Sequence, residues 1–374
     1  MRGSLKLFTW FGIPVFVHWT FGLIFVYVLW YAYSHDLSPN ETLWVTGLFM
    51  SIFGSVLLHE YGHALAARRY GVRTRDIVLM PIGGMARLER MPENPRQEFV
   101  VAIAGPLVNV LLFILTALAI SVLANPEHVS LIRDALISES SGEAYEETGI
   151  EIPKLLQYSI NFGVSNLILV LFNMIPAFPM DGGRVLRALL SMRIGRPRAT
   201  KIAAWIGQGF ALAFTAWGLY SGNFMLALLG LFVIYAARTE NNMVQTESIL
   251  SQYRVLDVVR PQFSRMRHND WMMQAIETLH HGLERHFLVF DLYDNLVGLL
   301  EEESILAAQR KPDVTAEVSA YMQRAEVVRM EDSLLLVNQL IRQRGYGLVG
   351  VVDAQGTLVG VVDEAGLNYF LQTR

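Results

Sequence analysis

Two histidines and a glutamate, spaced as His59-Glu60-x-x-His63, are the residues of this sequence best suited to metal chemistry. Four positions along a helix return to the same face, so both imidazoles could bind one Zn²⁺. Glu60 would then act as base toward a water that the metal activates. The three residues lie in the apolar stretch 47–67, which is long enough to cross a bilayer. The pattern therefore predicts zinc-dependent hydrolysis at membrane depth.

A catalytic zinc needs a third protein ligand, and Asp181 is the best candidate. It lies in the stretch NMIPAFPMDGG (residues 173–183), whose prolines interrupt a helix and whose glycines permit close backbone approach. Irregular backbone at membrane depth is tolerated where it is buried in protein or lines a wet cavity. We therefore expect Asp181 to meet His59 and His63 at a buried site.

Four more polar residues fall in apolar segments. Asn109 and His18 are additional candidates for contact with the substrate or its transition state. For Asn109 the alternatives are orienting a metal ligand or hydrogen bonding between helices. For His18 the alternative is a packed histidine near the end of the first span. Asn161 and Asn166 are expected to bond between helices, and Glu60 itself could instead pair with an interfacial arginine, Arg68 or Arg69.

The composition indicates what kind of protein must hold this site. The chain has 374 residues, of which 53% are hydrophobic and 17% charged, and its mean hydropathy is +0.35. These values are typical of a polytopic membrane protein with a soluble appendage. The absence of cysteine excludes disulfides and thiolate ligands, so a metal must use His, Asp or Glu. A net charge of −4 gives no sign of direct nucleic-acid binding.

Apolar segments predict about six transmembrane helices, at roughly residues 14–33, 44–67, 98–124, 155–177, 202–220 and 224–238. The N-terminal sequence leads into the first of them without a small-residue cleavage site. We therefore expect a retained span there, and not a signal peptide.

Charge in the loops predicts orientation. Basic residues gather after the second and the fourth segment: Arg68, Arg69, Arg73, Arg75, Arg87, Arg90, Arg96, Arg184, Arg187, Arg193, Arg196, Arg198 and Lys201. Residues 34–43 carry none, and residues 125–152 carry only Arg133. The positive-inside rule then places both termini in the cytoplasm. His59 would lie about two turns from the cytoplasmic end of its span.

The first 240 residues or so resemble the site-2 protease family of intramembrane zinc metalloproteases. HEYGH at 59–63 fits that family's HExxH element, and NMIPAFPMDGG at 173–183 fits its Asn-x-x-Pro-x-x-Pro-x-Asp-Gly element. AGPLVN at 104–109 is also typical of the family. No PDZ domain fits between the spans, so the chain is most similar to the compact bacterial and archaeal branch.

The resemblance implies roles for individual residues. His59, His63 and Asp181 would be the zinc ligands, and Glu60 would be the base. Asn173 would hold the substrate backbone or stabilise the transition state. The membrane protease domain would cover residues 1–240.

Residues 77–90, IVLMPIGGMARLER, predict a short hairpin after the second span, with a Gly-Gly turn. One interpretation is an edge strand that pairs with an unwound substrate segment. The other is a purely structural hairpin at the membrane surface. The resemblance favours the first.

The C-terminal part, residues 250–374, repeats with an offset of 62 positions: Asp270 and Asp332, Asp291 and Asp353, Gly298 and Gly360. Each copy predicts a helix, a strand, a turn, a strand and a helix. This resembles a tandem pair of cystathionine-β-synthase (CBS) domains, an α/β regulatory unit. Such pairs often bind adenine nucleotides. The usual threonine is missing from GLLEEES and GVVDEAG, so a module for dimerisation or docking is the alternative.

We therefore expect an intramembrane zinc endopeptidase in the cell membrane that cuts a transmembrane or membrane-tethered protein near the cytoplasmic face. The resemblance implies regulated release of a transcription regulator, from an anti-sigma factor or a sigma precursor. The rival hypotheses are a non-catalytic zinc-binding membrane scaffold and a CBS-regulated metal transporter. A transporter should show acidic residues along a path, whereas here they gather at the two motifs.

Overall fold

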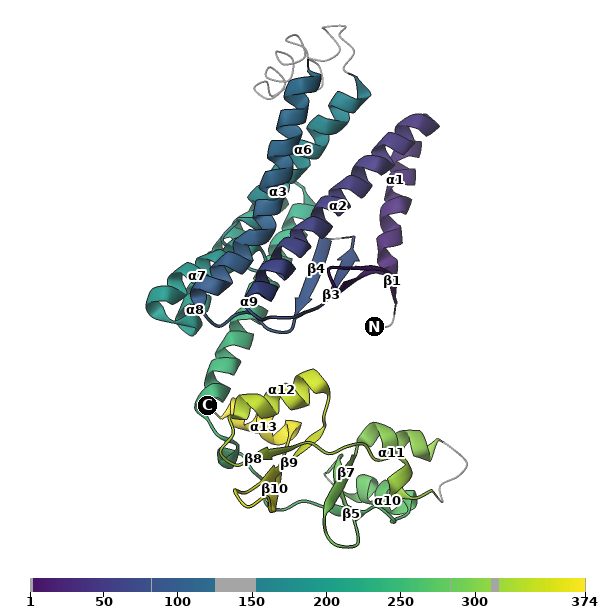
Figure 1. The fold of residues 1–374 in the computed structure, drawn as a ribbon, viewed down its shortest axis with the longest axis vertical. Helices are drawn as coiled ribbons and strands as arrows, with labels where there is room; N and C mark the ends of the chain where they lie inside the picture. Colours follow the sequence, from purple (N-terminus) through teal and green to yellow (C-terminus); the bar gives the residue numbers. More distant parts are fainter. Residues whose placement is uncertain (1–2, 82, 125–152, 283, 311–315, 374) are drawn as a thin grey trace. The chain divides into compact units, whose positions relative to one another are not determined.

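The computed structural model describes residues 3–81, 83–124, 153–282, 284–310 and 316–373 (Figure 1). The chain divides into two compact units, Met1–Asn241 and Asn242–Arg374, which we call the membrane unit and the tandem unit. Each is described by itself. Residues 125–152, which include Arg133, lie outside the described residues.

The first predicted span, 14–33, is only partly helical. Residues Ile13–His18 form strand β2, which pairs antiparallel with β1 (Ser4–Trp10) and parallel with β3 (Thr74–Met80). Helical structure starts with the 3₁₀ turn Trp19–Phe21 and continues as α1 (Gly22–Ser34). An apolar run does not separate strand from helix by itself, and here sheet pairing decides. The correction moves His18 from a span to the end of a strand.

Five described helices are long and apolar enough to cross a membrane, one fewer than predicted. They are α2 (Pro39–Arg69), α3 (Pro95–Leu123), α6 (Lys154–Asn173), α8 (Arg196–Tyr220) and α9 (Phe224–Gln252). The shorter α1 lies beside α2 (Figure 1). The chain is a multi-pass membrane protein.

The break in the fourth segment is more elaborate than predicted. Helix α6 ends at Asn173, and the next helix, α7 (Asp181–Ile194), begins at the aspartate itself. The intervening residues 174–180 contain Pro176 and Pro179, which cannot donate the hydrogen bonds of a continuing helix. Asp181 therefore enters the molecule at the first turn of a separate helix.

The predicted hairpin is present as β3 and β4 (Gly83–Leu88), in a four-stranded sheet of order β1-β2-β3-β4. Both glycines lie within β4 and not in the turn. A side chain on Gly84 would put its Cβ 2.8 Å from Cγ of Glu60, so close packing on α2 explains this glycine. β4 forms one edge of the sheet. At the other edge, β1 exposes its apolar side chains: Leu5, Leu7, Phe8 and Trp10.

One face of this sheet packs on α1 and α2 and forms the core beside the HExxH turn. Ile13, Val15, Ile77 and Leu79 from the strands share it with Phe21, Ile24, Val28, Tyr61 and Ala64. The hydroxyl of Tyr61, within the motif, donates to the Trp10 carbonyl over 3.3 Å. The sheet thus fixes the rotation of the helix turn that carries the histidines.

The tandem unit contains two copies of one α/β arrangement. The first copy has β5 (Arg265–Arg267), α10 (Met272–His281), β6 (Phe287–Phe290), β7 (Leu296–Leu300) and α11 (Glu302–Gln309). The second has β8 (Val327–Arg329), α12 (Leu334–Arg344), β9 (Leu348–Val352), β10 (Leu358–Asp363) and α13 (Glu364–Gln372). The predicted tandem CBS architecture is confirmed, with one extra short strand at the start of each copy.

The repeated aspartates make the same contacts in both copies. Asp270 and Asp332 accept from the backbone N–H of Arg267 and Arg329 over 2.7 and 2.8 Å. Each therefore closes the tight turn between the first strand and the helix. The offset of 62 in the sequence corresponds to two equal folding units.

Candidate metal centre

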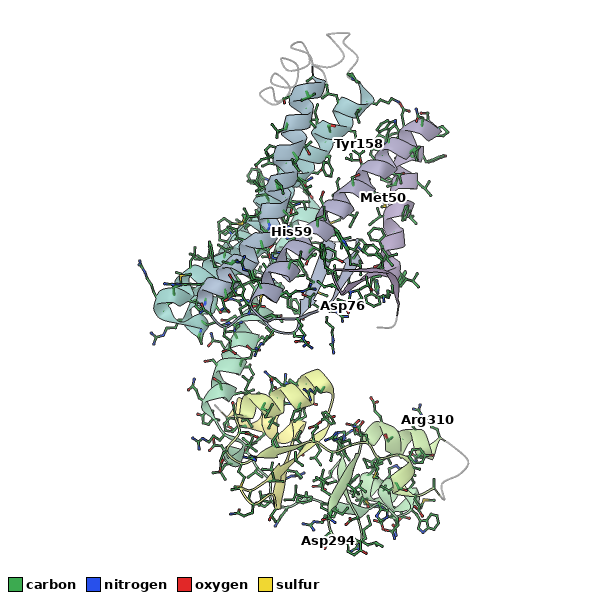
Figure 2. The ribbon with its side chains drawn as sticks, in the orientation of Figure 1. Met50, His59, Asp76, Tyr158, Asp294 and Arg310 are labelled. Carbon is green, nitrogen blue, oxygen red and sulfur yellow. The ribbon has the colours of Figure 1, made fainter. Side chains whose placement is uncertain are left out.

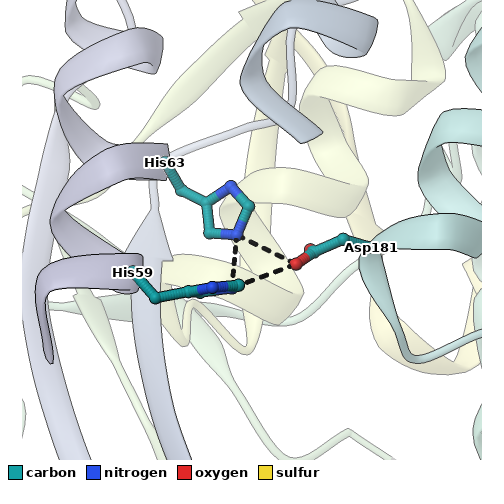
Figure 3. Close-up of side chains that lie close together, drawn as sticks. All are labelled: His59, His63 and Asp181. Carbon is teal, nitrogen blue, oxygen red and sulfur yellow. Dashed lines mark hydrogen bonds and ion pairs between the residues drawn. The ribbon is translucent and has the colours of Figure 1, made fainter. Parts of the chain in front are cut away.

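Three side chains meet in the membrane unit to form a compact set of metal donors. Nε2 of His59 and Nε2 of His63 lie 3.1 Å apart, and each lies 3.1 Å from Oδ2 of Asp181 (Figure 3). All three residues are buried. The structure thus brings together the three ligands that the sequence predicted, from helices 122 positions apart in the chain.

Hydrogen bonds on the far side of each ring orient the histidines. Nδ1 of His63 donates to the Val101 carbonyl over 2.7 Å. Nδ1 of His59 lies 2.5 Å from Oδ1 of Asn109. A bond of this kind holds the other ring nitrogen toward a metal and fixes the tautomer.

A chain of amides decides which nitrogen of His59 carries the proton. Nδ2 of Asn166 donates to the Phe162 carbonyl, which can only accept. Oδ1 of Asn166 therefore faces Nδ2 of Asn109, at 2.9 Å. Oδ1 of Asn109 is then left for His59, whose Nδ1 must donate. Asn109 and Asn166 thus form a hydrogen bond between two helices, and Asn109 also orients the ring of His59.

The donor set fits a cation. With both Nδ1 atoms protonated, each Nε2 presents a lone pair, and Oδ2 of Asp181 is a carboxylate oxygen. Three acceptors at 3.1 Å repel one another unless a positive charge lies among them. Tetrahedral Zn²⁺ with bonds of about 2.0–2.1 Å would separate its ligands by roughly 3.3 Å, close to what is found.

The backbone of α3 leaves room beside these atoms. A Cβ on Gly105 would lie 2.3 Å from Nε2 of His63 and 2.7 Å from Nε2 of His59. The glycine thus leaves open a space that any other residue would fill. Together with the chemistry of the donors, this space means that the residues present fit a zinc ion.

Asp181 owes its position to close contacts at the start of α7. A Cβ on Gly182 would lie 2.3 Å from the Ile175 carbonyl, and one on Gly183 would lie 2.7 Å from the Ala177 backbone. The two glycines let α7 press against residues 174–178. Nη1 of Arg184 lies 4.0 Å from Oδ1 of Asp181, the oxygen that faces away from the histidines.

Glu60 is held by the sheet. Its Oε2 accepts from the backbone N–H of Ala86 in β4 over 2.7 Å. The alternative partner Arg68 is engaged elsewhere, because its Nη2 donates to the Phe11 carbonyl. The carboxylate therefore lies on the edge strand, one residue along α2 from a metal donor.

The other predicted residues lie outside the donor group. Nδ1 of His18 accepts from the backbone N–H of Thr20 over 3.4 Å, which caps the short turn after β2, and lies 2.7 Å from the Thr20 hydroxyl. Nδ2 of Asn173 donates to the Leu169 carbonyl of its own helix over 3.0 Å. Asn161 lines a pocket of about 250 Å³ between α2 and α6, near Tyr158 (Figure 2).

Sequence reasoning missed one charged group near the site. Arg187 was counted with the cytoplasmic loop bases, but its side chain is fully buried and paired with Glu98 and Glu240. The three residues are 89 and 53 positions apart, so no local pattern connects them. The signal that was available is Glu98, an acid at the start of a predicted span.

Several known proteins are similar in sequence to this chain. The family model described as peptidase family M50 matches residues 47–216. A zinc metalloprotease of Methanocaldococcus jannaschii is 37% identical over 70% of this chain and 67% of its own length. A putative zinc metalloprotease of Synechocystis is 30% identical over 100% of this chain and 97% of its own length. Among solved structures, the site-2 protease from M. jannaschii is 36% identical, with a TM-score of 0.42, over 64% of this chain and 95% of that chain.

Proposed function

Since this chain belongs to peptidase family M50, the site-2 protease family of zinc metalloproteases, we propose that it is an intramembrane endopeptidase acting on membrane proteins. The meeting of His59, His63 and Asp181 at 3.1 Å carries the proposal. In it, these three residues hold the zinc and Glu60 serves as the base.

Bound zinc would act as a Lewis acid on the scissile carbonyl and lower the pKa of water at the site. The chain's own groups complete the reaction. A carboxylate oxygen of Glu60 accepts the proton of the attacking water and returns it to the leaving amine nitrogen. Asn109 and the Val101 carbonyl hold the two imidazoles in one tautomer throughout. Asn173 would stabilise the transition state after giving up its bond to Leu169.

The substrate would pair with β4. The N–H of Ala86 points away from β3, because it reaches the carboxylate of Glu60 instead. The outer edge of β4 therefore runs past the base, where an extended peptide could add as a further strand. A helix hides its carbonyls in its own hydrogen bonds, so the segment to be cut must unwind first. This supports the functional interpretation of the hairpin.

The charge of the loops supports an orientation with both termini in the cytoplasm and cleavage near the cytoplasmic face. The substrate would be a transmembrane or membrane-tethered protein. By the family resemblance, cleavage would release a transcription regulator held by an anti-sigma factor or as a sigma precursor. The protease would not itself touch nucleic acid.

The tandem unit would regulate access to the site. A bound adenine nucleotide is one proposed signal, although the nucleotide threonine is missing from both copies. Pairing of two chains through their tandem units is the other. Nucleotide titration and sedimentation of the purified protein test the two separately.

Replacing Glu60 by Gln tests the activity. The variant should fold and keep its zinc, because no ligand is lost, and should fail to cleave a co-expressed transmembrane substrate. Glu89→Gln, at an exposed position next to β4, is the matched control and should cleave normally. Wild-type cleavage by Glu60→Gln would remove Glu60 from the mechanism.

The two rivals predict other outcomes. A scaffold would bind zinc and cleave nothing even as the wild type. A transporter would move metal across vesicle membranes. Glu60→Gln would then change the metal flux, and neither the wild type nor the variant would cleave a substrate.

A further inference from the structure

Among the described residues of the membrane unit, the most deeply buried charge is a guanidinium that the proposed reaction does not use. The side chain of Arg187, on α7, is fully buried, and that of Glu98, in the first turn of α3, is 1% exposed. Nε of Arg187 lies 2.7 Å from Oε1 of Glu98, and Nη2 lies 2.5 Å from the same oxygen. Nη1 pairs with Glu240 of α9, which is partly exposed.

These partners belong to the segments that build the metal centre. Glu98 lies three residues before Val101, whose carbonyl holds the ring of His63. The guanidinium also stacks over the ring of Phe178, 5.1 Å from its centroid, in the loop that leads to Asp181. One side chain thus contacts the helix that supports the histidines and the loop and helix that deliver the aspartate.

The stability of the fold alone does not explain why an Arg–Glu pair is buried here. Removing two charges from water costs about as much as their attraction returns, and apolar replacements of equal volume are often no less stable. What a planar guanidinium adds is direction, because its donors point along fixed lines to two acceptors at once. An apolar side chain would fill the same space without fixing how far α7 lies from α3.

We propose that Arg187, paired with Glu98 and Glu240, is a positioning residue of the metal centre, which fixes the distance between Asp181 and the two histidines. The inference rests on the proposed ligand set and on no assumption about the substrate. Changing Arg187 is therefore expected to weaken zinc binding, and to slow cleavage only because zinc binding is weaker.

Arg187→Lys tests the proposal, with measurements on the full-length protein in detergent. The lysine keeps the charge but cannot bridge two carboxylates in fixed directions. We expect a folded protein, by gel filtration and melting, whose zinc affinity against a chelator falls about 10- to 100-fold. The visible absorption of the Co²⁺-substituted protein should shift, because ligand geometry has changed. Arg193→Lys, at the exposed end of α7, should match the wild type in all four measurements.

Two further variants complete the test. If Arg187→Lys does not fold, Glu98→Gln decides, because the amide oxygen still accepts one bond while the charge that fixes the guanidinium is lost. A folded variant with wild-type zinc affinity and cobalt spectrum overturns the proposal. Asp181→Asn separates the two levels of inference: if that variant binds zinc normally, the ligand set is wrong, whatever Arg187 does.

Discussion

Each histidine of the candidate metal centre depends on a support that comes from another helix. The ring of His63 is hydrogen-bonded to a backbone carbonyl of α3. The ring of His59 is hydrogen-bonded to the side chain of Asn109, which is in turn hydrogen-bonded to Asn166. A backbone support survives every substitution, but the amide chain does not. The centre is therefore protected on one side and open to mutation on the other.

Gly105 offers the sharpest test at the scale of one residue. Gly105→Ala would place a methyl carbon 2.3 Å from Nε2 of His63, so we expect zinc affinity to fall about 100-fold and cleavage to fall with it. Metal analysis of the purified variant and a cleavage assay measure this.

The matched control for that change is Gly54→Ala on α2. A Cβ there meets nothing within 4 Å, and alanine favours a helix over glycine by about 1 kcal/mol. This variant should keep its zinc and melt no lower than the wild type. Normal zinc binding by Gly105→Ala would mean that the space beside the histidines is not where the metal lies.

The short strand β4 does more at the site than its length suggests. It approaches α2 closely at Gly84, holds Glu60 through the N–H of Ala86, and leaves its outer edge unpaired within the described sheet. A sheet edge is a template for another strand. The same segment can therefore position the base and receive a peptide.

Removing the donor at Ala86 tests this element. Proline has no N–H and is tolerated on an edge strand when the lost N–H does not belong to the ladder. We expect Ala86→Pro to keep its zinc while kcat falls roughly 10- to 100-fold. This is less than the roughly 100- to 10,000-fold that a general base contributes, because Glu60 itself remains. Met85→Ala, which changes an exposed side chain and no hydrogen bond of the backbone, is the control. Unchanged kcat in a folded Ala86→Pro protein would contradict the role of β4.

Motifs with fixed spacing predicted most of this arrangement. The HExxH helix, the Asp181 element and the hairpin all follow from short patterns in the sequence. What could not be predicted depends on pairing between distant segments. β2 reads as part of a span until β3 is known to lie beside it, and Arg187 reads as a loop base until Glu98 and Glu240 are placed around it. Local residue types do not contain that information.

At the scale of the whole molecule, the chain joins a membrane unit with a buried candidate metal centre to a tandem unit with its own cores. The two copies of the tandem unit share a further core, built from Leu288, Phe290, Leu299, Leu348 and Val361. Next to it, the ring of His286 packs on Gly347 of the other copy, where a Cβ would lie 2.1 Å from the ring. An imidazole therefore lies where the copies meet.

Mild acid should loosen this contact between the copies. Burial lowers the pKa of His286 below its ordinary value of 6.5. Below pH 6.5 the imidazole of His286 takes up a proton more readily in the unfolded chain than in the folded unit. The free energy of unfolding therefore decreases as the pH is lowered from 6.5 to the folded-state pKa of His286, and it levels off below that pKa. The hydrogen-exchange protection factors of residues 287–300, which are corrected for the intrinsic effect of pH on exchange, should fall over that window.

Two variants check the origin of that response. His286→Gln should flatten the dependence on pH, because the titrating group is gone. His281→Gln, at an exposed position at the end of α10, should leave it unchanged. An unaltered profile in His286→Gln would assign the response to another group.

Strand β1 has a consequence for the lipid. Its exposed leucines, phenylalanine and tryptophan, together with Trp19, suit the boundary between headgroups and acyl chains. We therefore expect the sheet that ends in β4 to contact the bilayer surface at its opposite edge. The thickness of the hydrocarbon layer would then determine where the protease cuts, because it sets which residue of a substrate's membrane segment lies at the depth of the metal centre. The same protein in thinner or thicker bilayers would cut at shifted positions.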